Sequence, residues 1–282
     1  MYDSFFVTDL HGHPDRYRKL FSEIKKELPR FLFFGGDLLP HKMRLVENYK
    51  DFTRDFFFAE LRNLKFDLGD RYPEIYLILG NDDPKSEEWK FEEAAGQGLF
   101  NYVNMRKITF GKLTVYGYSY VPPTPFQLKD WEKYDVSRYV DPGCVHPTEG
   151  FRTVEPTEDI EYATIGKDLA NLTGMDDLSN AIMLFHSPPY KTNLDRAALD
   201  GMEVEHVPLD VHVGSIAIER FIEERQPLCT LHGHVHESTR ITGHWKEITG
   251  KTVSFNAAND GMELSVVKFN SKNPSESTRQ LY

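Results

Sequence analysis

The chain has 282 residues, of which 40% are hydrophobic and 27% charged, with a net charge of -11 and a mean hydropathy of -0.50. This composition is typical of a soluble globular protein of one or two domains, and no run of 18 apolar residues predicts a membrane span. A protein that follows a phosphate backbone needs clustered Lys and Arg, which this acidic chain lacks, so long nucleic acid is not expected as a partner. No signal peptide is evident and only Cys144 and Cys229 are present, so we expect a cytoplasmic protein with free thiols.

The first 118 residues alternate between apolar runs of strand length and segments with helical spacing. Strands are expected over 5–7, 31–34, 75–79 and 113–118, and helices over 15–28 and 45–68. This alternation predicts βαβ units with parallel strands, and hence an α/β fold.

Residues 119–158 break this periodicity. They mix prolines with aromatic side chains and show no repeat, so we expect an ordered, lid-like insertion near the functional site. A packed surface insertion remote from the site is the alternative. Phe126, Trp131 and Tyr134 are candidates to stack on a nucleotide base.

Periodic structure returns after the insertion. Helices are expected over 159–172 and 215–225, strands over 182–185, 228–231, 252–255 and 264–269, and a polar loop over 191–213. We expect a single domain over residues 1–270, followed by a polar, frayed tail over residues 271–282.

Residue types that bind metals follow the apolar runs. They are Asp9-Leu10-His11, Gly36-Asp37, Gly80-Asn81-Asp82-Asp83, His186 and Gly233-His234-Val235-His236. Because the carboxyl ends of strands in an open α/β sheet meet at one crevice, we expect these side chains to converge. Each motif alone is common without a metal, but together they offer carboxylate, amide and imidazole ligands to divalent cations. Two ions about 3.5–4 Å apart can clamp a phosphoryl group and acidify a bridging water, so the set predicts a two-metal site.

These motifs, in this order, resemble the calcineurin-like metallophosphoesterase superfamily. His186-Ser187-Pro188-Pro189-Tyr190 and Gly233-His234-Val235-His236-Glu237 more closely resemble the bacterial and archaeal relatives of the animal metallophosphoesterase-domain proteins. The resemblance implies a four-layer α/β/β/α sandwich of two mixed sheets flanked by helices. It also implies two ions, drawn from Mn, Fe, Zn or Ni, with one held by Asp9, His11, Asp37 and His236. The second would be held by Asp37, Asn81, His186 and His234, with Asp37 bridging.

One position departs from the family's Gly-Asn-His-Asp/Glu motif. Asp82 stands where the family has the His that is thought to protonate the leaving oxygen. A carboxylate is a poor proton donor near neutral pH unless burial or a neighbouring anion raises its pKa. Our catalytic candidates are therefore Asn81, Asp82 and Asp83, with the two aspartates sharing a proton. His13 and His41 are the candidate substitute acids.

The resemblance implies hydrolysis of a small phosphate ester by a metal-bridging hydroxide, with a phosphodiester or nucleotide favoured over a phosphomonoester. The alternative is a metal-binding sensor or scaffold with little catalysis, because Asp82 replaces the catalytic His. Similarity to protein Ser/Thr phosphatases is poor, since Leu38 follows Asp37 and Leu79 precedes Gly80 where those enzymes carry arginines.

Overall fold

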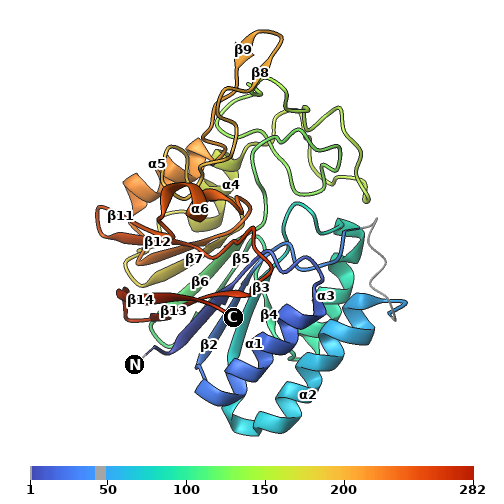
Figure 1. The fold of residues 1–282 in the computed structure, drawn as a ribbon, viewed down its shortest axis with the longest axis vertical. Coiled ribbons are helices and arrows are strands. Elements are labelled where there is room, and N and C mark those ends of the chain that lie inside the picture. Colours follow the sequence, from blue (N-terminus) through green and yellow to red (C-terminus); the bar gives the residue numbers. More distant parts are fainter. Residues whose placement is uncertain (1, 42–48) are drawn as a thin grey trace.

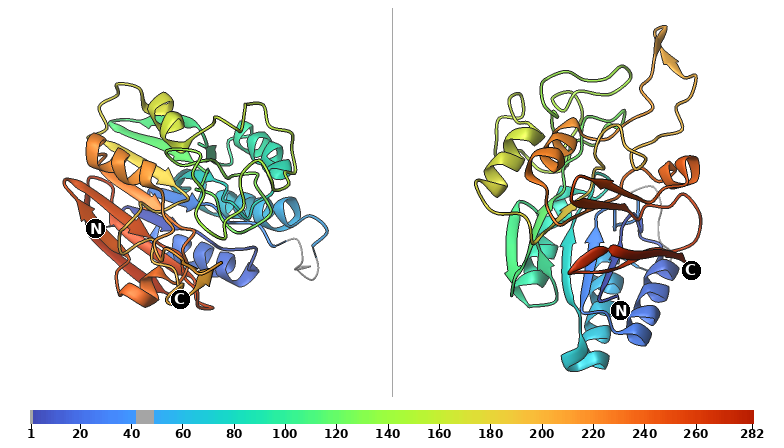
Figure 2. Two further views of the ribbon diagram at one scale, coloured as in Figure 1. Left: turned by 90° about the horizontal axis from the view of Figure 1, so that it is seen from above. Right: turned by 90° about the vertical axis from the view of Figure 1, so that its left-hand side faces the viewer.

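The computed structural model describes residues 2–41 and 49–282. Two sheets of six strands lie face to face, with helices on their outer sides (Figures 1 and 2). The strand order is β14-β13-β1-β2-β3-β4 in the first sheet and β11-β12-β10-β7-β6-β5 in the second. This is the four-layer α/β/β/α architecture that the family resemblance implied.

The first sheet is built from the N-terminal part of the chain and its C-terminal hairpin. Its parallel strands are β1 (Ser4–Val7), β2 (Phe31–Gly35), β3 (Glu74–Ile78) and β4 (Asn101–Tyr102). The antiparallel strands β13 (Ser265–Asn270) and β14 (Asn273–Leu281) extend it on the β1 side. The helices that pack against it are α1 (Pro14–Glu27), α2 (Ala59–Leu68) and α3 (Glu88–Gly96).

The second sheet comes from the later part of the chain. Its parallel strands are β6 (Leu113–Tyr118), β7 (Ala181–Phe185), β10 (Cys229–His232) and β12 (Thr252–Asn256). The antiparallel strands β5 (Arg106–Phe110) and β11 (Lys246–Thr249) form its edges. Its covering helices are α4 (Ile165–Thr173) and α5 (Ile216–Arg225), while the short helix α6 (Ser238–Thr242) and the hairpin of β8 (Glu203–Val204) and β9 (Val207–Pro208) lie beyond the strand ends.

Both faces of the central strands are buried. In β1, Phe5 and Val7 belong to the apolar layer beneath the helices, whereas Phe6 belongs to the layer between the two sheets. Phe33 and Ile182 contribute to that inner layer from opposite sheets. A strand that is buried on both sides is apolar at successive positions, which is why these segments are continuous apolar runs in the sequence.

Two of the expected helices differ in part from the prediction. Of the helix expected over 45–68, residues 45–48 lie outside the described residues and 49–51 are not helical, while Phe52–Phe58 forms a π-helical segment that is followed by α2. The helix expected over 159–172 begins only at Ile165, because the side chain of Thr164 accepts a hydrogen bond from Lys167 N and caps the helix there.

The prediction of a frayed C-terminal tail is wrong, because residues 273–281 form β14 on the edge of the first sheet. Lys268 of β13 is buried, and its ammonium lies 2.6 Å from Gln280 Oε1 and 2.6 Å from the Tyr282 hydroxyl. The polar side chains that made this segment look like a tail therefore satisfy a buried charge.

Residues 119–158, all of which the structure describes, form no helix and only isolated bridges. Trp131 and Tyr134 are buried, so the prediction that they stack on a base is wrong, whereas Phe126 is 55% exposed. Trp131 Nε1 donates a hydrogen bond to Asp83 O at 2.7 Å. Part of the insertion therefore lies against the loop that carries Asn81 and Asp82.

Both cysteines are free, as expected. None of the helices in residues 2–41 and 49–282 combines the length and apolar character that crossing a membrane would need.

Candidate metal centre

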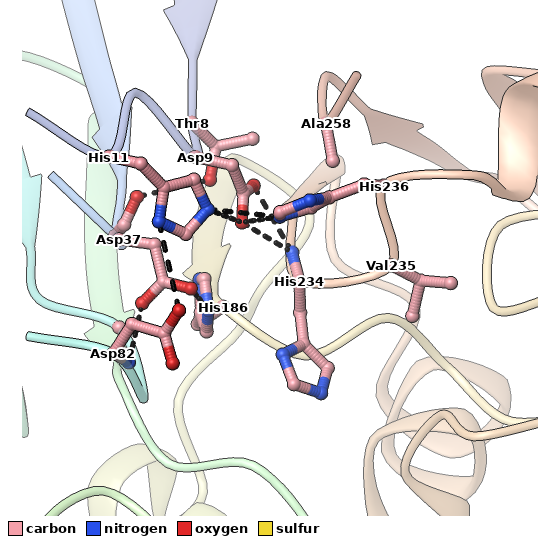
Figure 3. Close-up of polar contacts among 12 residues, drawn as sticks. Thr8, Asp9, His11, Asp37, Asp82, His186, His234, Val235, His236 and Ala258 are labelled. Atoms are coloured by element: carbon pink, nitrogen blue, oxygen red, sulfur yellow. Dashed lines mark hydrogen bonds and ion pairs between the residues drawn. The ribbon is translucent and has the colours of Figure 1, made fainter. Parts of the chain in front are cut away.

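The metal-binding motifs lie where the parallel strands of both sheets end. Asp9 follows β1, Asp37 follows β2 and Asn81 follows β3 in the first sheet, while His186 follows β7 and His234 follows β10 in the second. Side chains from these loops lie close together, as the close-up in Figure 3 shows for Asp9, Asp37 and His186. The sheet topology therefore brings together residues that are more than two hundred positions apart in the sequence.

The first expected ligand set forms a tight group. One potential ligand atom from each of four side chains lies within 4.8 Å of all the others, and these side chains are Asp9, His11, Asp37 and His236. His236 Nε2 lies 3.0 Å from Asp9 Oδ1 and 3.1 Å from His11 Nε2. The three side chains point toward one another in Figure 3. Two imidazole nitrogens and a carboxylate oxygen at these separations suit a common cation.

The second expected set is adjacent to the first but less compact. His186 Nε2 lies 3.2 Å from Asp37 Oδ2 and 3.0 Å from Asn81 Oδ1, while its Nδ1 is held 2.7 Å from Gly35 O. The His234 ring lies 5.3 Å from the His186 ring, centroid to centroid, and apart from the first group in Figure 3. Asp37 therefore contacts members of both sets, and His234 is the side chain that the structure brings in least closely.

Four of the expected ligands adopt left-handed backbone conformations. The φ angles are 54° at Asp9, 46° at His11, 51° at Asp37 and 69° at His234. Residues other than glycine rarely adopt this conformation, at a cost of about 1 kcal/mol or more each. Such strain clusters at functional sites, where the surrounding structure holds it in place.

Two glycines allow the loops to approach this closely. A Cβ atom at Gly80 would collide with the backbone and carboxylate of Asp37, and one at Gly233 would collide with the side chains of Thr8 and Asp9. Without these glycines, the loops after β3 and β10 would be pushed away from the carboxylates that they surround.

The buried carboxylates favour positive charge at this point. Burial opposes the charged form of His186, yet the charge of Asp37 and their hydrogen bond raise the pKa of His186 to about 10. Burial likewise opposes protonation of His236, but Asp9 raises its pKa to about 9. At His234 burial prevails and lowers the pKa to about 4, which leaves a neutral imidazole.

These residues fit divalent metal ions by their donor chemistry. The group combines buried carboxylates with imidazole nitrogens and an amide oxygen, and His11 Nδ1 is buried without a hydrogen-bond partner among the described residues. Without metal, protonated histidines balance the negative charge of the two buried carboxylates. Divalent cations at the same place would balance this charge more completely, and would use the neutral imidazoles as ligands.

Asp82, at the position that departs from the family motif, lies at the edge of this group. Its backbone N donates to Asp37 Oδ1 at 2.8 Å. Its carboxylate lies 3.2 Å from His41 Nε2 and 3.7 Å from His11 Nδ1. Of the two candidate substitute acids, His41 is thus next to Asp82, while His13 is the N-terminal cap residue of α1.

Asp83 is placed differently from its neighbour. It is fully buried, and its carboxylate accepts hydrogen bonds from Leu38 N, Leu39 N and Gly80 N. Burial, together with the Asp37 charge, raises its pKa to about 8. No hydrogen bond joins the carboxyl groups of Asp82 and Asp83 in the described part of the chain, so the shared proton that we expected has no support. The geometry makes Asp83 a residue that joins the loops after β2 and β3.

The sequence analysis missed a positioning residue. Arg16 of α1 donates to Asp9 O at 2.9 Å and to Gly261 O at 2.6 Å, which ties the first ligand loop to the segment before β13. The only sequence signal was its place one turn after the Asp9-Leu10-His11 motif.

Comparisons with known proteins identify the family of the chain and the fold that it shares with solved structures. The family model described as calcineurin-like phosphoesterase matches residues 5–238. Among solved structures, TT1561 of Thermus thermophilus matches with a TM-score of 0.55 at 13% identity, over 100% of this chain and 99% of that chain. A dimetal phosphatase from Danio rerio matches with a TM-score of 0.50 at 11% identity, over 100% of both chains. These two matches show a shared fold, and no curated protein sequence matches significantly. The chain belongs to the calcineurin-like phosphoesterase family.

Proposed function

We propose that this protein is a dinuclear-metal hydrolase of a small phosphate ester, with a phosphodiester or nucleotide favoured over a phosphomonoester. The observation that carries the proposal is the convergence of Asp9, His11, Asp37 and His236 on one point. The carboxylate of Asp37 also contacts His186, which in turn contacts Asn81. When bound, two divalent ions would supply the charge that holds the phosphoryl group and the acidified water that attacks it.

The protein's own residues have separate tasks in this proposal. Asp37 would help to hold both ions, and Asn81 would contribute a neutral oxygen without adding negative charge to a site that must accept a phosphate. Asp82 lies at the open edge of the site, with 22% of its side chain exposed and His41 beside it. These two residues are therefore placed to protonate the leaving oxygen. Asp83 positions the loops.

The acidic character of the chain supports a small substrate. With a net charge of -11, long-range electrostatics repel a polyanion, whereas a single phosphate ester is attracted locally by the ions. We infer a small-molecule substrate rather than a long nucleic acid.

The alternative function is metal binding with little catalysis, as a sensor or scaffold. The specific observation in its favour is Asp82, because loss of a general acid typically costs about 10²–10⁴-fold in rate. Metal would then contribute to stability and not to turnover.

Hydrolysis by the purified full-length protein tests the proposal. Bis(p-nitrophenyl) phosphate and p-nitrophenyl phosphate would be supplied in turn with Mn²⁺ and with excess chelator. We expect turnover that requires metal and is faster with the diester. Metal bound without turnover on either ester would overturn the proposal and favour the scaffold, and faster hydrolysis of the monoester would reverse the preference for a diester.

A further inference from the structure

A cavity of about 470 Å³ lies between the insertion and the loop that follows β7. Both walls lie beyond the carboxyl ends of the strands, on the same end of the sandwich as the metal centre (Figure 1). Its volume falls in the range of about 300–1,000 Å³ that is usual for small-molecule sites. None of the expected metal ligands lines it.

The lining of this cavity is mainly apolar. The lining combines prolines of the insertion with six larger side chains, which are Tyr139, Tyr190, Leu199, Met202, Val204 and Leu209. Tyr139 is 69% exposed and Met202 is 51% exposed, so the protein leaves apolar surface open to water here. Covering the apolar surface of such a cavity with an apolar group removes that surface from water, which lowers the free energy.

Most of the charged side chains in the lining are carboxylates. No Lys or Arg belongs to the lining residues found in the described chain, whereas Asp135, Asp141 and Asp210 do, and the one imidazole among them, His212, has its Nδ1 2.8 Å from Asp195 Oδ1. The Tyr190 hydroxyl donates to Asp210 at 2.6 Å, and burial together with the Asp210 charge raises the pKa of Asp141. A phosphate or a carboxylate would be repelled, while an uncharged group would be accepted.

Hydrogen bonds connect the walls of the cavity to the metal centre. Tyr190 follows the ligand His186 by four residues. Asn256 Nδ2 donates both to Leu194 O at 2.9 Å and to Val235 O, between the ligands His234 and His236, at 3.2 Å. Further along the same loop, Ala198 N donates to Glu237 Oε1 at 3.0 Å. The segment that forms one wall is therefore fastened to the loop after β10 at two points.

We propose that this cavity binds an uncharged, apolar organic group of the phosphate ester, of aromatic or nucleoside size, while the phosphoryl group lies at the metal centre. The inference rests on the proposed function and specifies its substrate class: esters with a bulky neutral group, as opposed to small alkyl phosphates or esters with a second anionic group. The cavity selects for the organic group, and the ions select for the phosphoryl group.

Binding of phosphonates tests this inference without requiring turnover, because their C–P bond is not an ester. Methylphosphonate, 4-phenylbutylphosphonate and the para-carboxylated form of the latter would be titrated calorimetrically into the Mn²⁺-loaded full-length protein. We expect the phenylbutyl compound to bind at least about tenfold more tightly than methylphosphonate, since a single methylene in an apolar pocket is already worth about that much. The added carboxylate should remove most of the gain.

Variants of the lining locate the effect. Met202→Asp and Leu209→Asp place a charge in the cavity and should abolish the gain from the phenylbutyl group while leaving the affinity for methylphosphonate unchanged. Met175→Asp, at a residue that is 99% exposed next to the end of α4, is the matched control and should leave the gain intact. Equal affinities for the methyl and phenylbutyl compounds, or a gain that survives both lining variants, would overturn the inference. If the metal-loaded protein binds no phosphonate and hydrolyses no phosphate ester, the proposed function itself is wrong and the inference falls with it.

Discussion

At the scale of single residues, Asp37 is the central side chain of the candidate site. One of its carboxylate oxygens lies 3.2 Å from His186 Nε2, the other accepts the Asp82 backbone N, and Asp37 also belongs to the first ligand group. Asn at this position keeps the shape but loses the charge that two cations would share. We expect Asp37→Asn to lower kcat/KM by at least about 10²-fold and to reduce the bound metal, as measured by atomic absorption.

Asp15→Asn is the control for that substitution, because the Asp15 side chain is 97% exposed at the start of α1. It should leave both metal content and activity unchanged. Full metal content and activity in Asp37→Asn would refute its bridging role.

Adjacent Asp82 and Asp83 are expected to differ in what they control. Asp82→Asn removes a carboxylate at the open edge of the site and should lower kcat about 10-fold or more and change its pH profile, with little effect on stability. Asp83→Asn replaces one of two acceptor oxygens with an NH₂ group, so at least one of the backbone N–H groups of Leu38, Leu39 and Gly80 loses its acceptor and meets a donor. This should lower the free energy of unfolding by about 1–3 kcal/mol. Steady-state kinetics and urea unfolding of both variants separate the two roles. An Asp82→Asn protein with unchanged rate and pH profile would mean that Asp82 takes no part in proton transfer.

At the scale of single elements, β14 is a polar edge strand that nevertheless contributes to stability. Lys268 of β13 has 3% of its side chain exposed, and its ammonium has Gln280, Tyr282 and Glu27 as partners. Deletion of residues 273–282 should lower the free energy of unfolding by on the order of 3 kcal/mol, because it removes partners of this ammonium along with the strand pairing.

The same deletion in a Lys268→Met background should cost less, because no ammonium then loses its partners. Urea unfolding of the four proteins gives the coupling. Unchanged stability after the deletion would indicate that residues 273–282 do fray.

The insertion contains a buried ion pair whose protonation should influence stability. Glu132 and Lys129 have fully buried side chains 2.6 Å apart. Burial, opposed by the Lys129 charge, raises the pKa of Glu132 from 4.5 to about 7. The folded protein therefore favours the protonated carboxyl, and this contribution to stability is full below pH 4.5 and is lost as the pH rises to about 7.

Glu132→Gln mimics the protonated form and should lack this loss. Between pH 5 and pH 8, we expect the variant to gain on the order of 1–3 kcal/mol relative to the wild type in urea unfolding. Glu149→Gln, on an exposed residue of the same insertion, should show no such gain. A difference that stays constant with pH would mean that Lys129 keeps Glu132 ionised throughout.

At the scale of the whole molecule, the metal centre joins the two sheets. Its expected ligands follow strands of both sheets, so cations bound there hold the two halves of the sandwich together. A ligand that binds only the folded state stabilises it by about 2.7 kcal/mol when its free concentration is a hundred times Kd. We expect Mn²⁺ to raise the Tm and chelator to lower it, as followed by differential scanning calorimetry, with a much smaller shift in Asp37→Asn. A Tm that is independent of metal in the wild-type protein would argue against a metal site between the sheets.

The convergence of the expected ligands was predictable because each motif is local. Asp9, His11, Asp37, His234 and His236 lie just after apolar runs, and parallel strands expose their carboxyl ends on one edge whatever the details of the turns. The fold class followed from the same alternation. The motifs do not show where each side chain points, so the separate roles of Asp82 and Asp83 emerged only from their contacts. The Asp82 carboxylate lies near two histidines, whereas the Asp83 carboxylate accepts hydrogen bonds from backbone amides.

Tertiary structure decided the parts of the protein that have no local signal. The polar segment 273–281 forms strand β14 because it pairs with the open edge of β13 and because its Gln280 side chain binds the buried ammonium of Lys268. Trp131 is buried because the loop after β3 supplies a carbonyl for its indole, and the apolar cavity exists because two irregular segments meet. The sequence by itself determined the α/β class and the chemistry of the ligands, since both depend on neighbours along the chain. Which segments pair at a sheet edge, which loops pack together and where a cavity forms depend on neighbours in space, which only the folded chain brings together.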